Sequence, residues 1–182
     1  DYLRALAQKN KAEDITRVLY PNDSTWEGKR LRIKQQYVLS SASLQDMLRT
    51  YKVAHGNDLS HFADYYAVQL NDTHPAMSIP ELIRLLMAEG MDFEQAFSIA
   101  QRTFSYTNHT VMKEALECWH EDLVRSLLPR IYQIIKEIDN RYRAHIWETT
   151  HDAGKVEEMA VTSNGVVRMA NLCVASCHSV NG

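Results

Sequence analysis

Apolar residues recur every three to four positions along most of the chain, which is the spacing of helices that bury one face. Helices are expected over residues 2–19 and 29–53, with turn-forming residues at 20–28 between them. Two more helices are expected over residues 78–90 and 92–103. The pattern therefore predicts a helix-rich chain with few strands.

The two middle helices carry specific end signals. Ser78 and Glu81 have the spacing of a capping box, and Gly90 fits the C-cap of the same helix. Asp92 is a favourable N-cap for the helix that follows. These signals predict two separate helices joined by a short turn.

The second half of the chain is expected to be helical from Trp119, with Pro129 opening a new helix. Asn164-Gly165 predicts a two-residue hairpin turn. A stripe over four turns after the proline predicts a buried face: Ile131, Ile134, Ile135, Ile138, Tyr142 and Ile146. No repeat or domain boundary interrupts the pattern, so residues 1–182 are interpreted as a single segment.

Two short stretches have the character of strands, and each ends in a polar cluster. Residues 67–70 run directly into Asp72 and His74, and residues 103–107 run into His109. The two helices between them form a crossover long enough for parallel pairing. Ligands of α/β proteins bind at the carboxyl ends of strands, so both clusters are expected to meet in one polar cleft.

The chemistry of this cluster suits a ligand rich in hydroxyl groups. Asp72, His74, His109 and, further along, Glu117 supply the acceptors and donors that sugar hydroxyls require. Two other interpretations stay open: Asp72 and His74 can bond the backbone of their own turn, or Asp72 and Glu117 can form the acid pair of a glycosidase. The sequence contains no glycine-rich phosphate loop, nucleophile elbow or zinc-protease motif.

Composition narrows the class of partner. The net charge of -3 and the pI near 6.2 favour neither nucleic acid nor an anionic membrane. No apolar run approaches the roughly 20 residues of a membrane span, and the N-terminus lacks the apolar core of a secretory signal, so a cytoplasmic protein is expected. The first residue is not Met, which suggests a segment cut from a longer chain.

The three cysteines are Cys118, Cys173 and Cys177, an odd number without the paired spacing of a disulfide framework. Cys173 and Cys177 lie one helical turn apart with His178 adjacent, so a metal clip is considered beside a buried helix face. Their spacing differs from that of known zinc sites, which favours the buried face.

Six strings in the sequence are long and distinctive: VLYPNDSTWEGKRLRIKQQY, LQDMLR, VQLNDTHPAMSIPELIRLL, YTNHTVMKEALECW, LLPRIYQIIKEI and HSVNG. In this order they resemble the α-glucan phosphorylases, the family of glycogen and maltodextrin phosphorylases. The resemblance implies the second half of the N-terminal, Rossmann-like domain of a two-domain phosphorylase of the glycosyltransferase-B type. The upstream part and the C-terminal cofactor domain would then lie outside residues 1–182.

The same resemblance implies an activity for the parent protein. Such enzymes cleave α-1,4-glucan with inorganic phosphate to give glucose 1-phosphate, and they hold pyridoxal phosphate on a lysine of the C-terminal domain. The parent is expected to be a homodimer, and the isolated fragment is expected to be inactive. The alternative is an autonomous carbohydrate-binding or assembly module without catalysis.

Particular residues match the family's functional positions. His109 matches the catalytic histidine that contacts the 6-hydroxyl of the glucosyl unit and whose carbonyl lies near the anomeric carbon. Asp72, His74 and Glu117 match residues that line the sugar pocket. The resemblance therefore implies one pocket built from the two strand ends and the Glu117 segment.

A mobile gate loop is matched by Asn22 and Asp23, which are expected to bind substrate, whereas Ser24 departs from the family pattern. Arg49 matches a regulatory arginine of animal enzymes, but Thr50 stands where those enzymes carry a second one. Loss of one member of a phosphate clamp weakens bidentate recognition. A bacterial-type enzyme with looser allosteric regulation is therefore expected.

Overall fold

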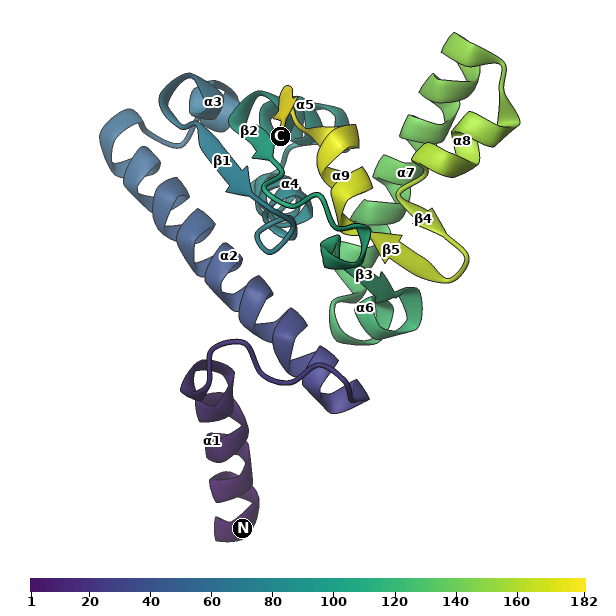
Figure 1. Cartoon of the computed structure of the whole chain (residues 1–182). Coiled ribbons are helices and arrows are strands. Elements are labelled where there is room, and N and C mark those ends of the chain that lie inside the picture. Colours follow the sequence, from purple (N-terminus) through teal and green to yellow (C-terminus); the bar gives the residue numbers. More distant parts are fainter.

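The computed structural model describes residues 1–182, except for the side chain of Lys113. Long helices surround two small sheets, each of three strands (Figure 1). The first sheet has the strand order β1-β2-β6 and the second has the order β3-β5-β4. The helix-rich α/β character predicted from the sequence is confirmed.

The first sheet is entirely parallel. Its strands are β1 (Val68–Asn71), β2 (Phe104–Thr107) and β6 (Ser179–Asn181). Val68 lies opposite Phe104, and Ser105 lies opposite Ser179. The crossover from β1 to β2 consists of α4 (Ser78–Ala88) and α5 (Phe93–Thr103). The predicted parallel pairing is confirmed, so all three strands end at the same edge.

The second sheet is antiparallel, and one of its strands was predicted as helix. Its strands are β3 (Cys118–His120), β4 (Thr162–Ser163) and β5 (Val166–Arg168). The prediction of helix from Trp119 is wrong, because Trp119 lies in β3, where it pairs with Val167 of β5 and is only 4% exposed. Helix α6 (Glu121–Leu127) begins after it. Pairing with a strand almost 50 residues away buries the indole, and local spacing does not report such pairing.

The hairpin turn between β4 and β5 is confirmed. Asn164 and Gly165 have φ values of 51° and 75°, as a two-residue turn with two left-handed positions requires. Asparagine and glycine are the residues that adopt this backbone at least cost.

Gly165→Ala is expected to destabilise the chain by about 1 kcal/mol, because a Cβ is strained at this positive φ. Asn164→Gly is the matched control and should leave stability nearly unchanged. Thermal unfolding followed by circular dichroism measures both variants. Equal midpoints for Gly165→Ala and the unaltered chain would contradict the prediction.

The remaining helices frame these sheets. They are α1 (Tyr2–Arg17), α2 (Trp26–His55), α3 (Phe62–Tyr65), α7 (Pro129–Thr150), α8 (Ala153–Met159) and α9 (Met169–Ser176), with 3-10 turns at Leu59–His61 and Lys113–Ala115. Helix α2 begins three residues before the predicted start, because the Thr25 hydroxyl caps it by accepting from the backbone N–H of Gly28. Helix α7 begins at Pro129, as predicted.

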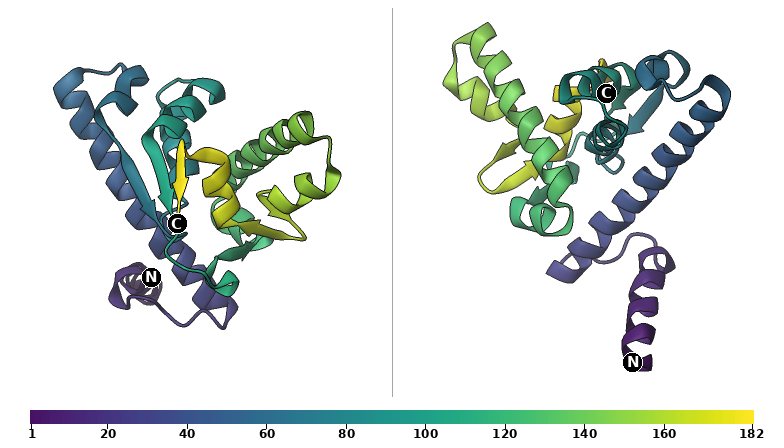
Figure 2. Two further views of the ribbon diagram at one scale, coloured as in Figure 1. Left: turned by 45° about the horizontal axis from the view of Figure 1, so that its top comes forward. Right: turned by 180° about the vertical axis from the view of Figure 1, so that it is seen from behind.

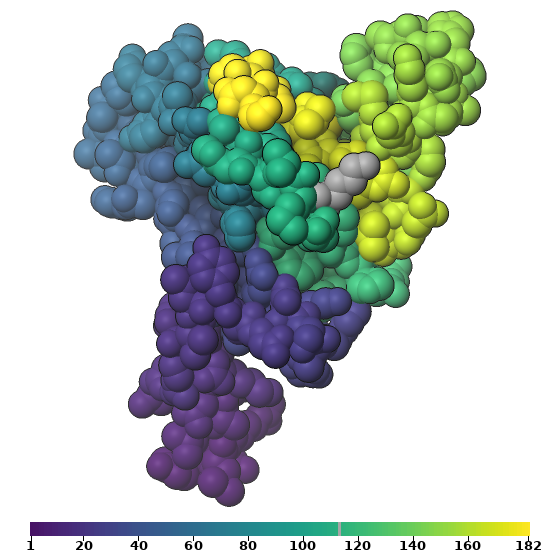
Figure 3. All heavy atoms as spheres, in the orientation of Figure 1, coloured from purple at the N-terminus to yellow at the C-terminus, as the bar shows by residue number. Residues whose placement is uncertain are grey.

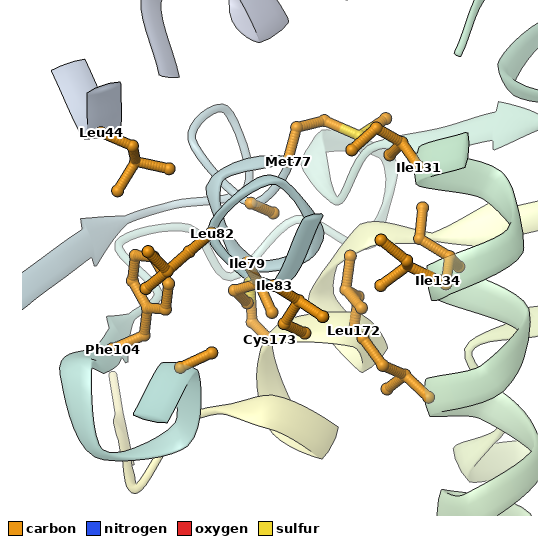
Figure 4. Packing of buried hydrophobic residues seen from close by; sticks show 14 of the residues in the cluster. Leu44, Met77, Ile79, Leu82, Ile83, Phe104, Ile131, Ile134, Leu172 and Cys173 are labelled. Carbon is orange, nitrogen blue, oxygen red and sulfur yellow. The ribbon is translucent and has the colours of Figure 1, made fainter. Parts of the chain in front are cut away.

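The core forms around α4, which packs on α2, α5 and α7. Figure 4 shows Ile79, Leu82 and Ile83 of this helix among side chains from four other elements: Leu44, Phe104, Ile131, Ile134, Leu172 and Cys173. The predicted stripe of α7 is buried at all five isoleucines, and Tyr142 is partly buried. Cys173 lies inside this cluster, as the buried-face interpretation predicted, whereas Cys177 is the partly buried C-cap of α9.

The capping box predicted at the start of α4 is wrong. The N-cap is Met77, which forms no side-chain cap, and Glu81 is completely buried. Its carboxylate accepts hydrogen bonds from Tyr37 Oη at 2.9 Å, Ser41 Oγ at 2.6 Å and two nitrogens of Arg84 at 2.7 and 2.8 Å. Glu81 therefore joins α4 to α2 instead of capping its own helix.

The C-cap of α4 is Glu89, one residue before the predicted Gly90, and the predicted N-cap Asp92 of α5 is confirmed. Gly90, with φ 100°, follows the C-cap of α4, and the N–H groups of Gly90 and Met91 bond to carbonyls of the last turn. Asp92 caps α5 by accepting from the backbone N–H of Gln95 at 2.9 Å. The two helices are thus separated as the sequence predicted.

Helix α1 projects away from the rest of the molecule, and none of its residues is buried (Figures 2 and 3). The segment of residues 18–25 leads from it to α2. Gln35 of α2 donates to the carbonyl oxygen of Val18 at 2.7 Å, so this segment is held against the helix.

Candidate functional site

The carboxyl ends of β1 and β2 bring Asp72 and His109 together. The backbone N–H of His109 donates to Asp72 Oδ1 at 2.7 Å, and the His109 ring lies 3.4 Å from Asn71 Oδ1. Asp72 has a φ of 59°, a left-handed position that aspartate tolerates better than most residues. The turn after β1 thus directs a carboxylate across to the next strand.

Both peptide groups that flank His109 are anchored. Asp72 accepts from the N–H of His109, and the side chain of Asn108 accepts from the N–H of Thr110 at 3.3 Å and donates to the Thr110 carbonyl at 2.8 Å. The N–H of Thr110 shares a peptide plane with the carbonyl of His109. The direction of that carbonyl dipole is therefore set by the protein before any ligand binds.

Tyr106 is the second-to-last residue of β2. Its hydroxyl is buried without a hydrogen-bond partner among the described residues. Burial, followed by electrostatic interaction with Cys173, Asp72 and Cys177, raises the pKa of Tyr106 to about 12. Tyr106 is therefore a neutral phenol at physiological pH.

Glu117 is the centre of a second polar cluster that reaches the same turn. Its Oε1 accepts from Thr73 Oγ1 at 3.0 Å, and its Oε2 accepts from Arg32 Nη2 and Gln36 Nε2, both at 2.9 Å. The Glu117 side chain is 11% exposed. Both oxygens of Glu117 are therefore bonded to donors of the protein, as Oδ1 of Asp72 is to the N–H of His109.

Arg32 connects Glu117 to Asp23, one of the two predicted gate residues. The Nη1 of Arg32 donates to Asp23 at 2.8 Å, whereas Asn22 is exposed and accepts from the backbone N–H of Ser24. A Cβ at Gly28 would come within 1.8 Å of the Asn22 carbonyl oxygen, so only glycine permits this close approach. The segment that carries Asn22 and Asp23 is thereby packed against the first turn of α2.

His74 lines a cavity of about 190 Å³ whose walls are mainly apolar. Its other lining residues are Leu19, Tyr20, Arg32, Gln35, Gln36, Leu39, Ser40 and Pro75. The ring of Tyr20 meets His74 edge-on at 6.0 Å. Asp72 and His109 are not among the lining residues of this cavity, and the single cleft expected for Asp72, His74 and His109 stays a prediction.

Arg49 is separate from this region. It is exposed on α2 and pairs with Asp46 at 2.7 Å. Arg32 and Arg49 are 17 positions apart in one helix, or about 25 Å along its axis. The regulatory role of Arg49 stays a prediction from the resemblance.

The described part of the chain offers neither a metal cluster nor a membrane-spanning helix. No group of three or more His, Cys, Asp and Glu side chains in it is arranged to hold a metal ion. Nor does any helix there combine the length and apolar character needed to cross a membrane.

The residues that bond to Glu117 were not predicted from the sequence. Arg32 and Gln36 lie four positions apart on one face of α2, and Thr73 lies inside the polar string after β1. The i, i+4 spacing shows that Arg32 and Gln36 share a face, but nothing local shows that Glu117 meets them.

A parallel sheet with helices in its crossover defines a helix-rich α/β protein, and its polar side chains lie at the strand ends, where proteins of this class commonly bind ligands. The sequence matches the carbohydrate phosphorylase family over residues 1–182. The chain belongs to this family.

Three relatives illustrate the similarity. The alpha-glucan phosphorylase, H isozyme, of Triticum aestivum is 48% identical over all of this chain, and that of Vicia faba is 50% identical over 95% of it. The muscle form of human glycogen phosphorylase is 44% identical over all of this chain. The chain spans only 22–23% of the length of these relatives.

Proposed function

We propose that the chain is part of an α-glucan phosphorylase that transfers a glucosyl unit from α-1,4-glucan to inorganic phosphate and releases glucose 1-phosphate. In this proposal it forms the second half of an N-terminal Rossmann-like domain. The parallel β1-β2-β6 sheet and the names of the relatives support that placement. A homodimeric, cytoplasmic parent is part of the same proposal.

The observation that carries the proposal is the bond between Asp72 and the backbone N–H of His109 at the strand ends. With the Asn108 bonds to Thr110, it orients the carbonyl of His109 in advance. A fixed dipole placed beside the anomeric carbon would stabilise positive charge that develops as the glycosidic bond breaks. His109 would also contact the sugar through its exposed ring.

His74 and Glu117 would border the same sugar site, and Asn22 and Asp23 would form its gate. Arg32 supports this arrangement, because it lines the cavity beside His74 and bonds to both Glu117 and Asp23. Arg49 would then serve regulation from a distance. The relatives reported above come from plants and animals, so looser, bacterial-type regulation rests on Thr50 alone.

Pyridoxal phosphate, which this family is expected to use, does not fit the residues of this chain. A Schiff base for this reaction needs a lysine amine beside the sugar site, but Lys155 lines a different cavity, with Tyr142 and Thr150. No lysine is among the described residues that line the cavity beside His74. In this proposal the lysine that binds the cofactor therefore lies outside residues 1–182.

The full-length parent protein, supplied with maltoheptaose, phosphate and pyridoxal phosphate, is expected to release glucose 1-phosphate, whereas residues 1–182 alone are expected to release none. An enzymatic assay for glucose 1-phosphate measures both. Product formation by residues 1–182 alone, or none by the full-length protein, would overturn the proposal. Fluorescence of Trp26 and Trp119 tests the alternative of an autonomous module, which requires saturable binding of maltoheptaose by this chain.

A further inference from the structure

Glu117 has little capacity left to bind a substrate. A carboxylate offers about four lone-pair directions. Donors from Arg32, Gln36 and Thr73 occupy three of them at 2.9–3.0 Å. With a side chain that is 11% exposed, Glu117 is placed to hold protein groups in position.

The groups that Glu117 holds are the two parts of the proposed sugar site. Thr73 is 1% exposed and lies between Asp72 and His74, so its hydroxyl anchors the turn that carries both of them. Arg32 leads in the other direction, because its second nitrogen binds Asp23 at 2.8 Å. One carboxylate thus connects the turn after β1 with the segment of residues 18–25.

Arg32 is itself confined by its surroundings. Its guanidinium lies 6.0 Å from the ring of Tyr20 and 5.9 Å from the ring of Trp119, distances at which a cation and an aromatic face attract each other. Asp23 is 45% exposed, whereas Glu117 is 11% exposed. Because exposed ion pairs are weak, the bond to Glu117 is the firm half of the bridge and the bond to Asp23 is the one that opens more easily.

We propose that Glu117 is a positioning residue, which acts through Thr73 on the Asp72–His74 turn and through Arg32 on the segment of residues 18–25. This inference rests on the proposed function, but it changes the role of Glu117 from a sugar ligand to the support of groups that meet the sugar. A turn displaced by 1 Å lowers a reaction rate by about a hundredfold when it carries reacting groups.

The test uses the full-length protein with paired substitutions at Thr73. Thr73→Val keeps the shape and removes the hydroxyl, whereas Thr73→Ser keeps the hydroxyl. Thr73→Val is expected to lower kcat about tenfold with KM for maltoheptaose changed less than about threefold, and Thr73→Ser should stay near the unaltered enzyme. Steady-state kinetics with both substrates varied measures the split between kcat and KM.

Glu117→Ala is expected to lower kcat by about a hundredfold, and Thr73→Val added to it should cost little more. Such non-additivity identifies two residues that act in one chain of contacts. If Glu117→Ala raises KM while kcat is kept, or if Thr73→Val and Thr73→Ser have equal activity, Glu117 does not act by positioning. Thermal unfolding checks that each variant folds, and if Glu117→Ala does not, the Thr73 pair decides. An inactive unaltered enzyme would instead overturn the proposed function.

Discussion

Asp72→Ala in the full-length protein is expected to lower the rate of glucan phosphorolysis by about two orders of magnitude, because it releases the backbone at His109. The substitution removes the acceptor of the 2.7 Å bond from the His109 N–H. It also places alanine at a φ of 59°, a backbone that alanine adopts only with strain. The carbonyl of His109 would then lose its fixed direction.

Asp72→Asn is the matched control. Asparagine tolerates the left-handed backbone and keeps an oxygen for the His109 N–H, so the rate should fall by less than about tenfold. Initial rates of glucose 1-phosphate release at saturating substrates give the comparison. The prediction is wrong if the alanine and asparagine variants are equally impaired, since charge and not geometry would then dominate.

The reference for both variants is His109→Ala, which is expected to lower the rate by a similar or larger factor. If Asp72 works through His109, the double variant should lose much less than the product of the two single losses. Independent losses would mean that Asp72 meets the substrate by itself.

Glu81→Ala is expected to destabilise the chain by about 3–5 kcal/mol, the usual loss when one member of a buried charged network is removed. Glu81 is completely buried and accepts from Tyr37, Ser41 and Arg84. Its removal leaves these donors without an acceptor between α2 and α4. Burial, followed by the bond to Glu81, raises the pKa of Tyr37, so the phenol stays a donor at neutral pH.

A second ion pair between the same two helices provides the control. Lys52 of α2 binds Glu89, the C-cap residue of α4, at 2.6 Å, and the Glu89 side chain is 45% exposed. Because the pair is open to solvent, Glu89→Ala should cost less than about 1 kcal/mol. Urea unfolding of the three proteins compares the two sites, and similar midpoints for Glu81→Ala and Glu89→Ala would contradict the argument from burial.

Helix positions followed from the sequence because the signals for them are local. The α7 stripe, the Pro129 start, the Asp92 cap and the Asn164-Gly165 turn each depend on side chains a few positions apart. Such short-range relations can be read from the sequence where no distant contact competes with them.

Two wrong predictions, a helix from Trp119 and a capping box at Glu81, are explained by long-range contacts. Trp119 belongs to a strand because β5 pairs with it, and Glu81 leaves its expected cap because donors on α2 satisfy it better. In each case a partner about 40 or more positions away outweighs the local preference. Tertiary contacts routinely override propensity in this way.

Part of the candidate site was likewise predictable from the sequence, and part depended on long-range contacts. The sequence by itself determined that polar residues follow two strands with a helical crossover, and hence that Asp72 and His109 would meet at one edge. Only the tertiary structure decided that His74 lines a cavity with Arg32 and that Glu117 binds Arg32, Gln36 and Thr73. Hydrogen bonds between distant segments depend on how the helices pack, and that packing is a property of the whole core.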